Sequence, residues 1–422
     1  MQSVARHYTA FPYPHVVELH REEPAGRSAG ALDWLLGRRP PRTFSGRRLR
    51  IWVAGCGTQQ AVQIALAFGD AEVLGTDVSG ESLRVGQRLA RQLGLTGLRF
   101  ERADLSASRA TGAFDLIFCT GVLHHLDDPL AGLRTLERAL GPDGAAVLML
   151  YSRVHRVGYE HFRNGVRAFC GGIADRARDV RTTTALLRAV LRSPCRPLLA
   201  DELRAVYRDR RRDLPTFADT VLHPHERHFD IDELMAFVRA GGFRFGSWAR
   251  PADWEPGRYL DERGVHRRLA RLGALDRWRV VYWLGGHASP LFRFIVEKAA
   301  SPRPAPWRAA EIRRLPVIGL RARTRYQVRH AHITRALRPR VTSSRRGVLR
   351  LRYEPFYGEE TQLELPAGLA STLDRAARGA TVAELTDRWD MPADERVRFG
   401  IIRRLLPDQH GYLVPFRSPT GS

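Results

Sequence analysis

The feature that most constrains this chain is a regular alternation of short apolar runs and amphipathic stretches between residues 48 and 151. The pattern predicts strands at 49–54, 71–77, 98–101, 114–119 and 145–151, and helices at 60–68, 80–93 and 130–140. The stretch G-P-D-G at 141–144 predicts a turn. Strands that alternate with helices in this way form a parallel sheet covered on both faces. A ligand of such a sheet lies at the carboxyl ends of the strands, near the point where the strand order reverses.

The first predicted strand runs into a glycine-containing turn, I-W-V-A-G-C-G-T-Q-Q at residues 51–60. Two glycines spaced by one residue after an apolar run indicate a sharp passage from strand to helix. A dinucleotide-binding fingerprint would need a third glycine where the chain has Gln60, and a P-loop would need Gly-Lys-Ser/Thr. Neither of the common phosphate-binding interpretations fits the turn.

Five segments in order over about 100 residues then define a resemblance: V-A-G-C-G-T, L-G-T-D-V-S, R-A-D-L, F-D-L-I-F-C-T-G-V-L-H-H-L-D-D-P and L-G-P-D-G-A-A-V-L-M-L-Y. This succession resembles the class I S-adenosylmethionine-dependent methyltransferases. Two later segments, P-H-E-R-H-F-D-I-D-E-L-M-A-F-V-R-A-G-G-F and L-F-R-F-I-V-E-K, resemble the last helix and the closing antiparallel strand pair of that fold. The resemblance implies an α/β, doubly wound, Rossmann-like sheet of seven strands, and S-adenosyl-L-methionine as cofactor.

The resemblance also implies a cofactor site in the loops that follow the first four strands. The turn of Gly55 and Gly57 brings the backbone close to the methionine part and the ribose, because glycine has no Cβ. Asp77 matches the acid that binds both ribose hydroxyls, and Asp104 matches the residue that accepts from the adenine amino group. A second interpretation of Asp77, as a cap of the helix at 80–93, stays open. The implied set is Gly55, Cys56, Gly57, Thr58, Gln59, Asp77, Val78, Ser79, Ala103, Asp104, Leu105, Thr120 and Gly121.

The loop departs from the family pattern at three positions. Val53 stands where the family often has an acid, so the amino group of the cofactor lacks that carboxylate. Gln59 and Gln60 replace small residues, and their amides either bind the cofactor carboxylate or crowd it. These departures bear on cofactor affinity and not on cofactor identity.

His124 and His125 follow the fourth strand, beside the expected position of the methyl donor, and are the candidates for catalysis. A histidine there is suited to deprotonate a hydroxyl or amine at neutral pH, and packing around the cofactor is the alternative role. Adjacent residues at such a junction point in different directions, so at most one is expected to face the cleft. A second histidine group, His223, His225 and His228, raises the question of a metal, but no thiol or carboxylate pair completes a site and no metal is predicted.

The remaining segments predict the domain organisation. Residues 1–44, with H-Y-T-A-F-P-Y-P, suit an aromatic lid over the donor site, and the methyltransferase domain at 45–300 carries helical insertions at 152–222 and 251–289. The proline-rich A-A-S-P-R-P-A-P-W marks a boundary near residue 299. Residues 301–422 are expected to form a basic linker and a small C-terminal domain, in which G-A-T-V-A-E-L and G-Y-L-V-P resemble a winged-helix unit.

Composition narrows the class of protein. With 422 residues and 44% hydrophobic content, the chain is long enough for two or three domains. Four cysteines at wide spacings, Cys56, Cys119, Cys170 and Cys195, predict buried reduced thiols. There is no apolar signal core at the N-terminus and no stretch long enough to cross a membrane, so a soluble cytoplasmic protein without a membrane partner is expected.

The formal charge of +23 is concentrated in one segment, because residues 301–350 hold 14 arginines against the single acid Glu311. A solvated basic face and a site for an acidic partner such as RNA are both consistent with it. The leading function is methyl transfer to an O, N or C nucleophile of a small-molecule or peptide acceptor. An RNA methyltransferase is the alternative, although C-T-G-V replaces the Asn/Asp-Pro-Pro-Tyr/Phe motif of base amino methylation. A cofactor-binding protein without turnover is the third, suggested by Val53 and Gln59; the oligomeric state is not predicted.

Overall fold

The structure is a computed structural model, and the chain divides into two compact units, one of residues 1–19, 41–65 and 70–303 and the other of residues 20–40, 66–69 and 304–422. In the first unit it describes residues 2–14, 48–65, 71–171, 176–195, 200–209, 213–249, 251–254, 256, 260, 262–269, 271–285 and 291–301. In the second it describes residues 66–68 and four short strands.

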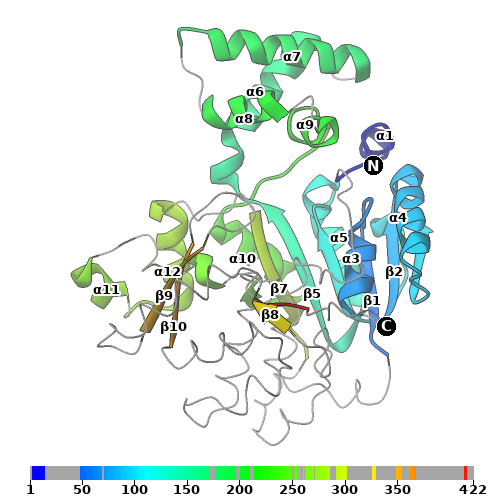
Figure 1. The fold of residues 1–422 in the computed structure, drawn as a ribbon, viewed down its shortest axis with the longest axis vertical. Coiled ribbons are helices and arrows are strands. Elements are labelled where there is room, and N and C mark those ends of the chain that lie inside the picture. Colours follow the sequence, from blue (N-terminus) through cyan, green and yellow to red (C-terminus); the bar gives the residue numbers. More distant parts are fainter. Residues whose placement is uncertain are drawn as a thin grey trace, which may run out of the picture. The chain divides into compact units, whose positions relative to one another are not determined.

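The first unit is built on one sheet of seven strands in the order β3-β2-β1-β4-β5-β7-β6 (Figure 1). Its strands are β1 Arg50–Ala54, β2 Glu72–Asp77, β3 Leu98–Arg102, β4 Phe114–Thr120, β5 Leu140–Tyr151, β6 Phe243–Trp248 and β7 Leu291–Lys298. Strands β1 to β5 pair in parallel, and β7 runs antiparallel to both β5 and β6. The predicted fold class and the antiparallel closing pair are confirmed. The strand order reverses between β1 and β4, so a ligand is expected at the carboxyl ends of those two strands.

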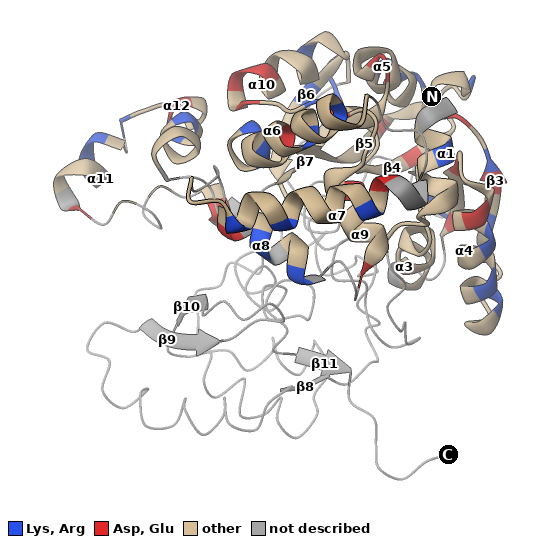
Figure 2. Cartoon of the chain, turned by 90° about the horizontal axis from the view of Figure 1, so that it is seen from above, with Lys and Arg blue, Asp and Glu red and all other residues tan. Residues whose placement is uncertain are grey.

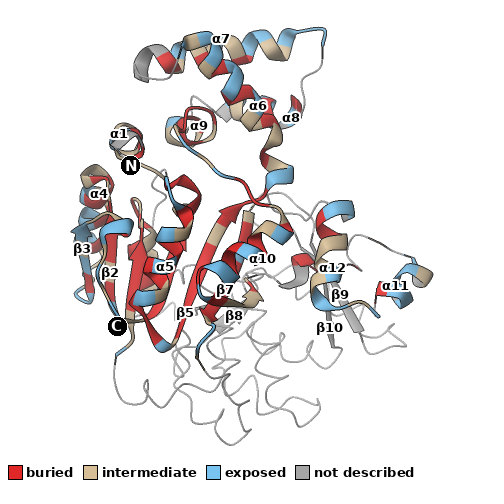
Figure 3. Cartoon of the chain, turned by 180° about the vertical axis from the view of Figure 1, so that it is seen from behind, coloured by how far each residue is buried: buried red, intermediate tan, exposed pale blue. Residues whose placement is uncertain are grey.

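Helices cover both faces of this sheet. Helices α3 (Gln60–Ala67) and α4 (Gly80–Gln92) connect β1 to β2 and β2 to β3, whereas α5 (Pro129–Ala139) connects β4 to β5 in the opposite direction along the sheet. Right-handed crossovers in opposite directions place α5 on the other face from α3 and α4. On the α5 face, α10 (Ile231–Ala240) packs beside α5 over a shared core with the strands. Figure 3 shows this core as a buried layer along the strands.

A group of four helices, here called the cap, follows β5: α6 Arg153–Cys170, α7 Arg176–Arg192, α8 Ala200–Asp209 and α9 Leu214–Val221. The cap has its own apolar core, which includes Phe162, Leu187 and Phe217. Phe11, just after helix α1 (Gln2–Ala10), packs against the same core. The cap is therefore a separate layer, visible above the sheet in Figure 1, and the N-terminal segment contacts it.

A second set of short elements lies between β6 and β7: η4 Pro251–Trp254, α11 Arg263–Leu269, α12 Ala274–Val280 and η6 Val281–Gly285. The indole rings of Trp248 and Trp254 stack 3.7 Å apart, and Trp278 packs edge-on against Trp248. Helices α4 and α12 each carry one acidic residue near the start and basic residues after it (Figure 2). These two helices therefore carry mixed charge.

Two sequence-based expectations need correction. The G-P-D-G stretch lies within β5, which begins at Leu140 and pairs with β4 through a register shift between Phe114 and Leu116. Cys56 and Cys119 are buried, but Cys195 is exposed and Cys170 is half-buried, so the thiols are not all interior. Burial raises the pKa of the Cys119 thiol to about 12, which makes it unreactive.

The C-terminal region is described only as two antiparallel strand pairs. Strand β8 (Tyr326–Val328) pairs with β11 (Leu413–Pro415), and β9 (Val348–Tyr353) pairs with β10 (Thr361–Pro366). The expected helices of a winged-helix unit and most of the basic 301–350 segment lie outside the described residues, so these assignments and the domain boundaries stay predictions. Among the described helices, none has the length and apolar content needed to span a membrane.

Candidate active site

The turn after β1 is tightly covered by the rest of the protein. Gly55 and Gly57 have positive φ values of 66° and 56°, a conformation that favours glycine. A Cβ on Gly55 would collide with the side chain of Val122, and one on Gly57 would lie 2.5 Å from the carbonyl oxygen of Tyr13. Both glycines are therefore required by contacts within the protein, in addition to any approach of a cofactor.

Asp77 lies at the end of β2 beneath this turn, with 9% of its surface exposed. Its Oδ2 accepts from the backbone N–H of Gly57 at 2.9 Å and its Oδ1 from that of Ser79 at 2.8 Å. Ser79 is the residue that caps α4, accepting from Ser82, so Asp77 is not the helix cap. Burial raises the pKa of Asp77, and the bonds from Ser79 and Gly57 act in the lowering direction.

The other residues expected at the cofactor site occupy the neighbouring strand ends. Asp104 caps a short helical turn, where its Oδ1 accepts from Ser106, and Leu105 is buried beside it. The backbone N–H of Ala103 donates to the carbonyl of Asp77, and Arg102 donates to that of Val78. The ends of β2 and β3 are thus joined by hydrogen bonds, and the carboxylates of Asp77 and Asp104 lie at the same end of the sheet.

Thr120 ends β4 on the other side of the switch point, and Gly121 follows it. The amide of Gln60 donates to the hydroxyl of Thr120 at 2.6 Å. This hydrogen bond connects the loop after β1 with the end of β4. Gln59, Thr58 and Cys56 are buried in the turn. Gln60 therefore has a partner within the protein, which favours a role in loop packing over crowding of the cofactor.

The two histidines after β4 have different surroundings. His124 is fully buried against the ring of Tyr151, 4.0 Å between centroids, and neither of its ring nitrogens has a hydrogen-bond partner among the described residues. His125 turns towards the cap, and its Nδ1 lies 2.9 Å from the carbonyl oxygen of His225. A carbonyl can only accept, so Nδ1 carries the proton and Nε2 holds the lone pair. Of the two predicted candidates, His125 has the geometry of a base.

Burial keeps His125 neutral. It lowers the pKa of His125, although the charges of Asp219 and Glu226 and the bond to His225 act in the raising direction. Burial lowers the pKa of His124 and of His223 still further. A neutral imidazole with an available lone pair is the form that accepts a proton from a substrate.

A carboxylate from the cap completes a buried cluster around His125. Asp219 of α9 is 4% exposed and accepts from two phenol hydroxyls, Tyr8 at 2.8 Å and Tyr151 at 3.3 Å. Burial and the charge of Asp219 raise the pKa of both tyrosines, so both remain protonated donors. The ring of His223 stacks 3.7 Å from that of His125. We call His125, Asp219, Tyr8, Tyr151 and His223 the acceptor cluster.

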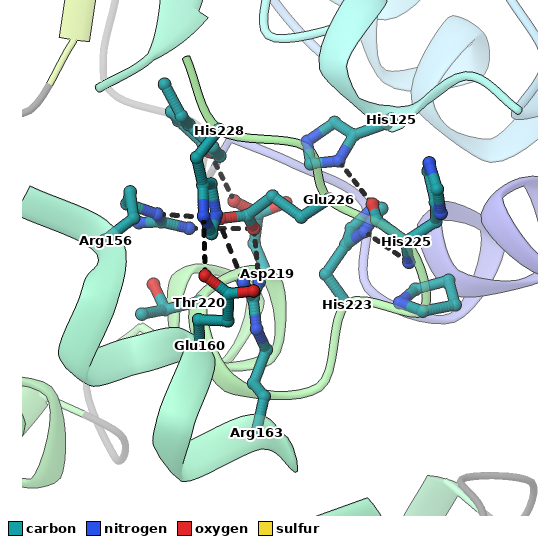
Figure 4. A network of polar contacts seen from close by, with 12 residues as sticks. His125, Arg156, Glu160, Arg163, Asp219, Thr220, His223, His225, Glu226 and His228 are labelled. Carbon is teal, nitrogen blue, oxygen red and sulfur yellow. Dashed lines mark hydrogen bonds and ion pairs between the residues drawn. The ribbon is translucent and has the colours of Figure 1, made fainter. Parts of the chain in front are cut away.

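A buried ion-pair network holds the loop that carries His223 and His225 (Figure 4). Arg156 of α6 binds both carboxylate oxygens of Glu226, at 2.8 and 2.9 Å, and Arg163 and His228 bind the same group. Burial alone would raise the pKa of Glu226, but His228, Arg156 and Arg163 outweigh it and hold that pKa well below its usual range. The loop is therefore clamped to the cap by a permanently ionised carboxylate.

The predicted histidine group separates into different roles. His223 joins the acceptor cluster, His225 contributes its carbonyl to His125, and His228 lies between Glu226 and Glu160. The sequence placed Tyr8 in an expected aromatic lid but gave no role to Asp219 or Tyr151, because isolated Asp and Tyr residues far apart in the chain carry no spacing signal. A buried acid within an otherwise apolar helical turn, F-A-D-T-V, is the one local sign that Asp219 is unusual.

Ring nitrogens of His125 and His223 and a carboxylate oxygen of Asp219 lie within 4.8 Å of one another, a spacing that raises the question of a metal ion. The hydrogen bonds argue against it. The backbone N–H of His225 donates to His223 Nδ1 at 3.2 Å, so the neutral ring carries its proton on Nε2. A ligating imidazole instead needs an acceptor opposite its second nitrogen. Both oxygens of Asp219 also accept from tyrosine hydroxyls, which further disfavours their direct coordination of a metal ion.

Comparisons with known proteins agree with the fold and the loops. The family described as "Methyltransferase domain" matches residues 52–148. An uncharacterized protein of Synechococcus sp. is 27% identical over 72% of this chain and 73% of its own length. The ubiquinone biosynthesis O-methyltransferase of Ralstonia nicotianae is 29% identical over 30% of this chain, and the match spans only 49% of that enzyme.

Among solved structures, PKMT2 from Rickettsia typhi in complex with AdoHcy superposes with a TM-score of 0.57 at 14% identity, covering 96% of this chain and 78% of that one. At this identity the likeness concerns the fold. Residues 52–148 are therefore a methyltransferase domain, and the sheet and the loops described above have the class I S-adenosylmethionine-dependent methyltransferase arrangement. The cofactor of this class of domain is S-adenosylmethionine. Asp77 and Asp104 lie at adjacent strand ends, where the resemblance implies contacts with its ribose and adenine.

Proposed function

We propose that the enzyme methylates an amine nitrogen of a small-molecule or peptide acceptor, and that the acceptor cluster binds this amine. The observation that carries the proposal is the carboxylate of Asp219, buried beside the neutral imidazole of His125. His125 follows β4 by a few residues and Tyr151 ends β5, so the cluster adjoins the loops proposed to hold the cofactor.

The sign of the charge favours an amine. An ammonium group is stabilised by a buried carboxylate, whereas a phenolate or a carboxylate acceptor would be repelled by it. Arg156, a buried cation whose charge acts on His125 and Tyr151, is committed to Glu226 and lies over the ring of Tyr151. Asp219 itself is hydrogen-bonded only by neutral phenols in the described part of the chain, so its charge is available to a cationic acceptor.

The same residues supply the proton transfer that methylation of an amine requires. A protonated amine has no lone pair, so one proton must leave before nitrogen reacts. His125 accepts this proton at Nε2, and the carbonyl of His225 stabilises the resulting imidazolium through Nδ1–H. When bound, S-adenosylmethionine supplies a methyl group whose bond to sulfur breaks with its electron pair on sulfur. The chain contributes charge, orientation and a base.

No comparable observation favours RNA as the acceptor, because the basic segment 301–350 lies almost entirely outside the described residues. The O-methyltransferase names belong to relatives that share only part of their length with this chain. The proposed cofactor residues, including Asp77, Asp104, Thr120 and Gly121, and the base His125 are supported by their positions at the strand ends.

A matched panel of acceptors tests the proposal. Transfer of a labelled methyl group is measured to an alkylamine, to a peptide with one lysine and to a phenol of similar size. We expect methylation of the amines, and in Asp219→Asn a loss of kcat/KM of about 100-fold or more, as expected when one partner of a buried charge pair is removed. Asp201→Asn, on an exposed part of the cap, is the control and should leave kcat/KM unchanged. Methylation of the phenol in preference to the amines would refute the proposal.

A further inference from the structure

Residues 2–14, here called the strap, contact the cofactor loops at one end. Thr58 donates its backbone N–H to the carbonyl of Tyr13 at 3.3 Å and its hydroxyl to that of Pro14 at 2.7 Å. The hydroxyl of Ser79, at the start of α4, donates to the carbonyl of Tyr8 at 3.2 Å. The strap is therefore bonded to two of the loops that flank Asp77.

The same short segment reaches the acceptor cluster. The hydroxyl of Tyr8 donates to Asp219, the ring of His7 lies 5.0 Å from that of His223, and Phe11 packs into the cap core. Tyr8 thus bonds to the cofactor side through its carbonyl and to the acceptor side through its hydroxyl. The strap connects three parts of the unit that are otherwise far apart in the sequence.

With the strap in this position the site is closed. Asp77, Asp219 and His223 expose 9%, 4% and 0% of their surfaces. Turnover requires that cofactor and acceptor enter and that products leave, so something that covers these residues must move. The strap is the best candidate among the covering segments. It is bonded to the cofactor loops through hydrogen bonds accepted by its backbone carbonyls, whereas the loop 223–228 is clamped by buried ion pairs.

We infer that the strap opens and closes in each catalytic cycle, and that Tyr8 is the positioning residue through which closure completes the acceptor site. Asp219 keeps the hydrogen bond from Tyr151 throughout and receives the one from Tyr8 only when the strap is closed. Closure of the strap and retention of the cofactor product are therefore coupled through one side chain. The inference depends on the position of Tyr8 and not on the chemical class of the acceptor.

Two tyrosine variants separate this role from a general effect on Asp219. Tyr8→Phe and Tyr151→Phe each remove one hydroxyl bound to Asp219, but only Tyr8 lies on the strap. We expect both variants to lower kcat, because both change the acceptor site. Only Tyr8→Phe should accelerate dissociation of S-adenosylhomocysteine, by about tenfold, the effect of losing a hydrogen bond to a charged group. Stopped-flow displacement of the bound product analogue measures this rate in the full chain.

Equal dissociation rates in the two variants would overturn the inference. A second measurement on the unmodified protein is independent of how the variants fold. Backbone hydrogen exchange within residues 2–14 should slow when S-adenosylhomocysteine saturates the enzyme, because closure is favoured by the bound product. Unchanged exchange in the strap would show that it does not move. Both readouts use only the cofactor product, so a failure of the amine proposal would leave them unaffected.

Discussion

The residues proposed to bind the cofactor at the ends of β1 to β4, here called the cofactor edge, adjoin the acceptor cluster at one end of the sheet. The two regions are assembled differently. Every residue proposed for the cofactor edge is the last residue of β1, β2, β3 or β4 or follows that residue by a few positions. The acceptor cluster draws on α1, the turn after β4, the end of β5, α9 and the loop after it, and its Tyr8–Asp219 bond spans 211 positions of sequence. The first region is built from local turns, whereas the second exists only once the cap and the strap have packed.

The two regions also differ in how they are held. The cofactor turn is fixed by backbone hydrogen bonds and by glycines that nothing larger could replace. The acceptor cluster depends on the loop 223–228, which is fixed by Glu226 and its buried cations. This difference predicts that a single substitution will impair either cofactor binding or the function of the acceptor cluster, and will spare the other.

The largest effect is expected when the clamp is broken. Glu226→Gln leaves Arg156 and Arg163 as buried charges without their counterion, and breaking such a pair costs about 3 to 5 kcal/mol in the free energy of unfolding. Chemical denaturation followed by fluorescence measures the loss. Asp232→Asn, which removes an exposed partner of Arg279, is the control and should change the free energy of unfolding little. Similar losses in both variants would show that the network does not clamp the loop.

The next effect concerns the base. His125→Gln should lower kcat by about 100-fold or more while leaving the affinity for S-adenosylhomocysteine nearly intact. His124→Gln is the matched control, because His124 is equally buried but lies against Tyr151 without a hydrogen-bond partner among the described residues. It should reduce stability more than kcat. If both variants lose cofactor binding equally, the histidines serve packing and neither is the base.

The contrast between the regions also explains what the sequence could predict. The strand ends, the antiparallel closing pair and the positions of Asp77 and Asp104 follow from hydrophobic periodicity, from turn residues and from the resemblance they support. The pairing of His125 with His225, and the choice between His124 and His125, depend on a loop 100 residues away. The turn expected at G-P-D-G failed because pairing of Leu140 with Phe114 extended the strand past a local turn signal. Local chemistry predicted the cofactor edge, whereas tertiary packing decided the acceptor cluster.

A smaller effect is expected at the cofactor edge. Asp77→Ala removes the carboxylate proposed to bind both ribose hydroxyls, which should weaken binding of S-adenosylhomocysteine by about thirty-fold. Isothermal calorimetry measures the affinity directly. Part of the loss will come from the turn itself, because Asp77 also accepts from the N–H groups of Gly57 and Ser79. Asp77→Asn retains one acceptor oxygen and should recover part of the affinity. An affinity of Asp77→Ala within threefold of the parent would contradict the assignment.

The smallest effect is the response to pH. Burial lowers the pKa of His125, so the base remains neutral below the ordinary histidine value of about 6.5, and the acid limb of kcat should lie below that pH. The pKa values of His124 and His223 are lowered as well, so the unfolded chain binds more protons than the folded one between the folded pKa values and about 6.5. The free energy of unfolding should therefore be constant above about pH 6.5 as far as these histidines contribute. As the pH drops from about 6.5 to the folded pKa values it should fall, by at most about 1.4 kcal/mol per pH unit for each histidine, and it should level off below them. Denaturation at a series of pH values, compared with His125→Gln, isolates the contribution of His125. An acid limb above pH 6.5 that persists in the His125→Gln variant would assign the proton transfer to another group.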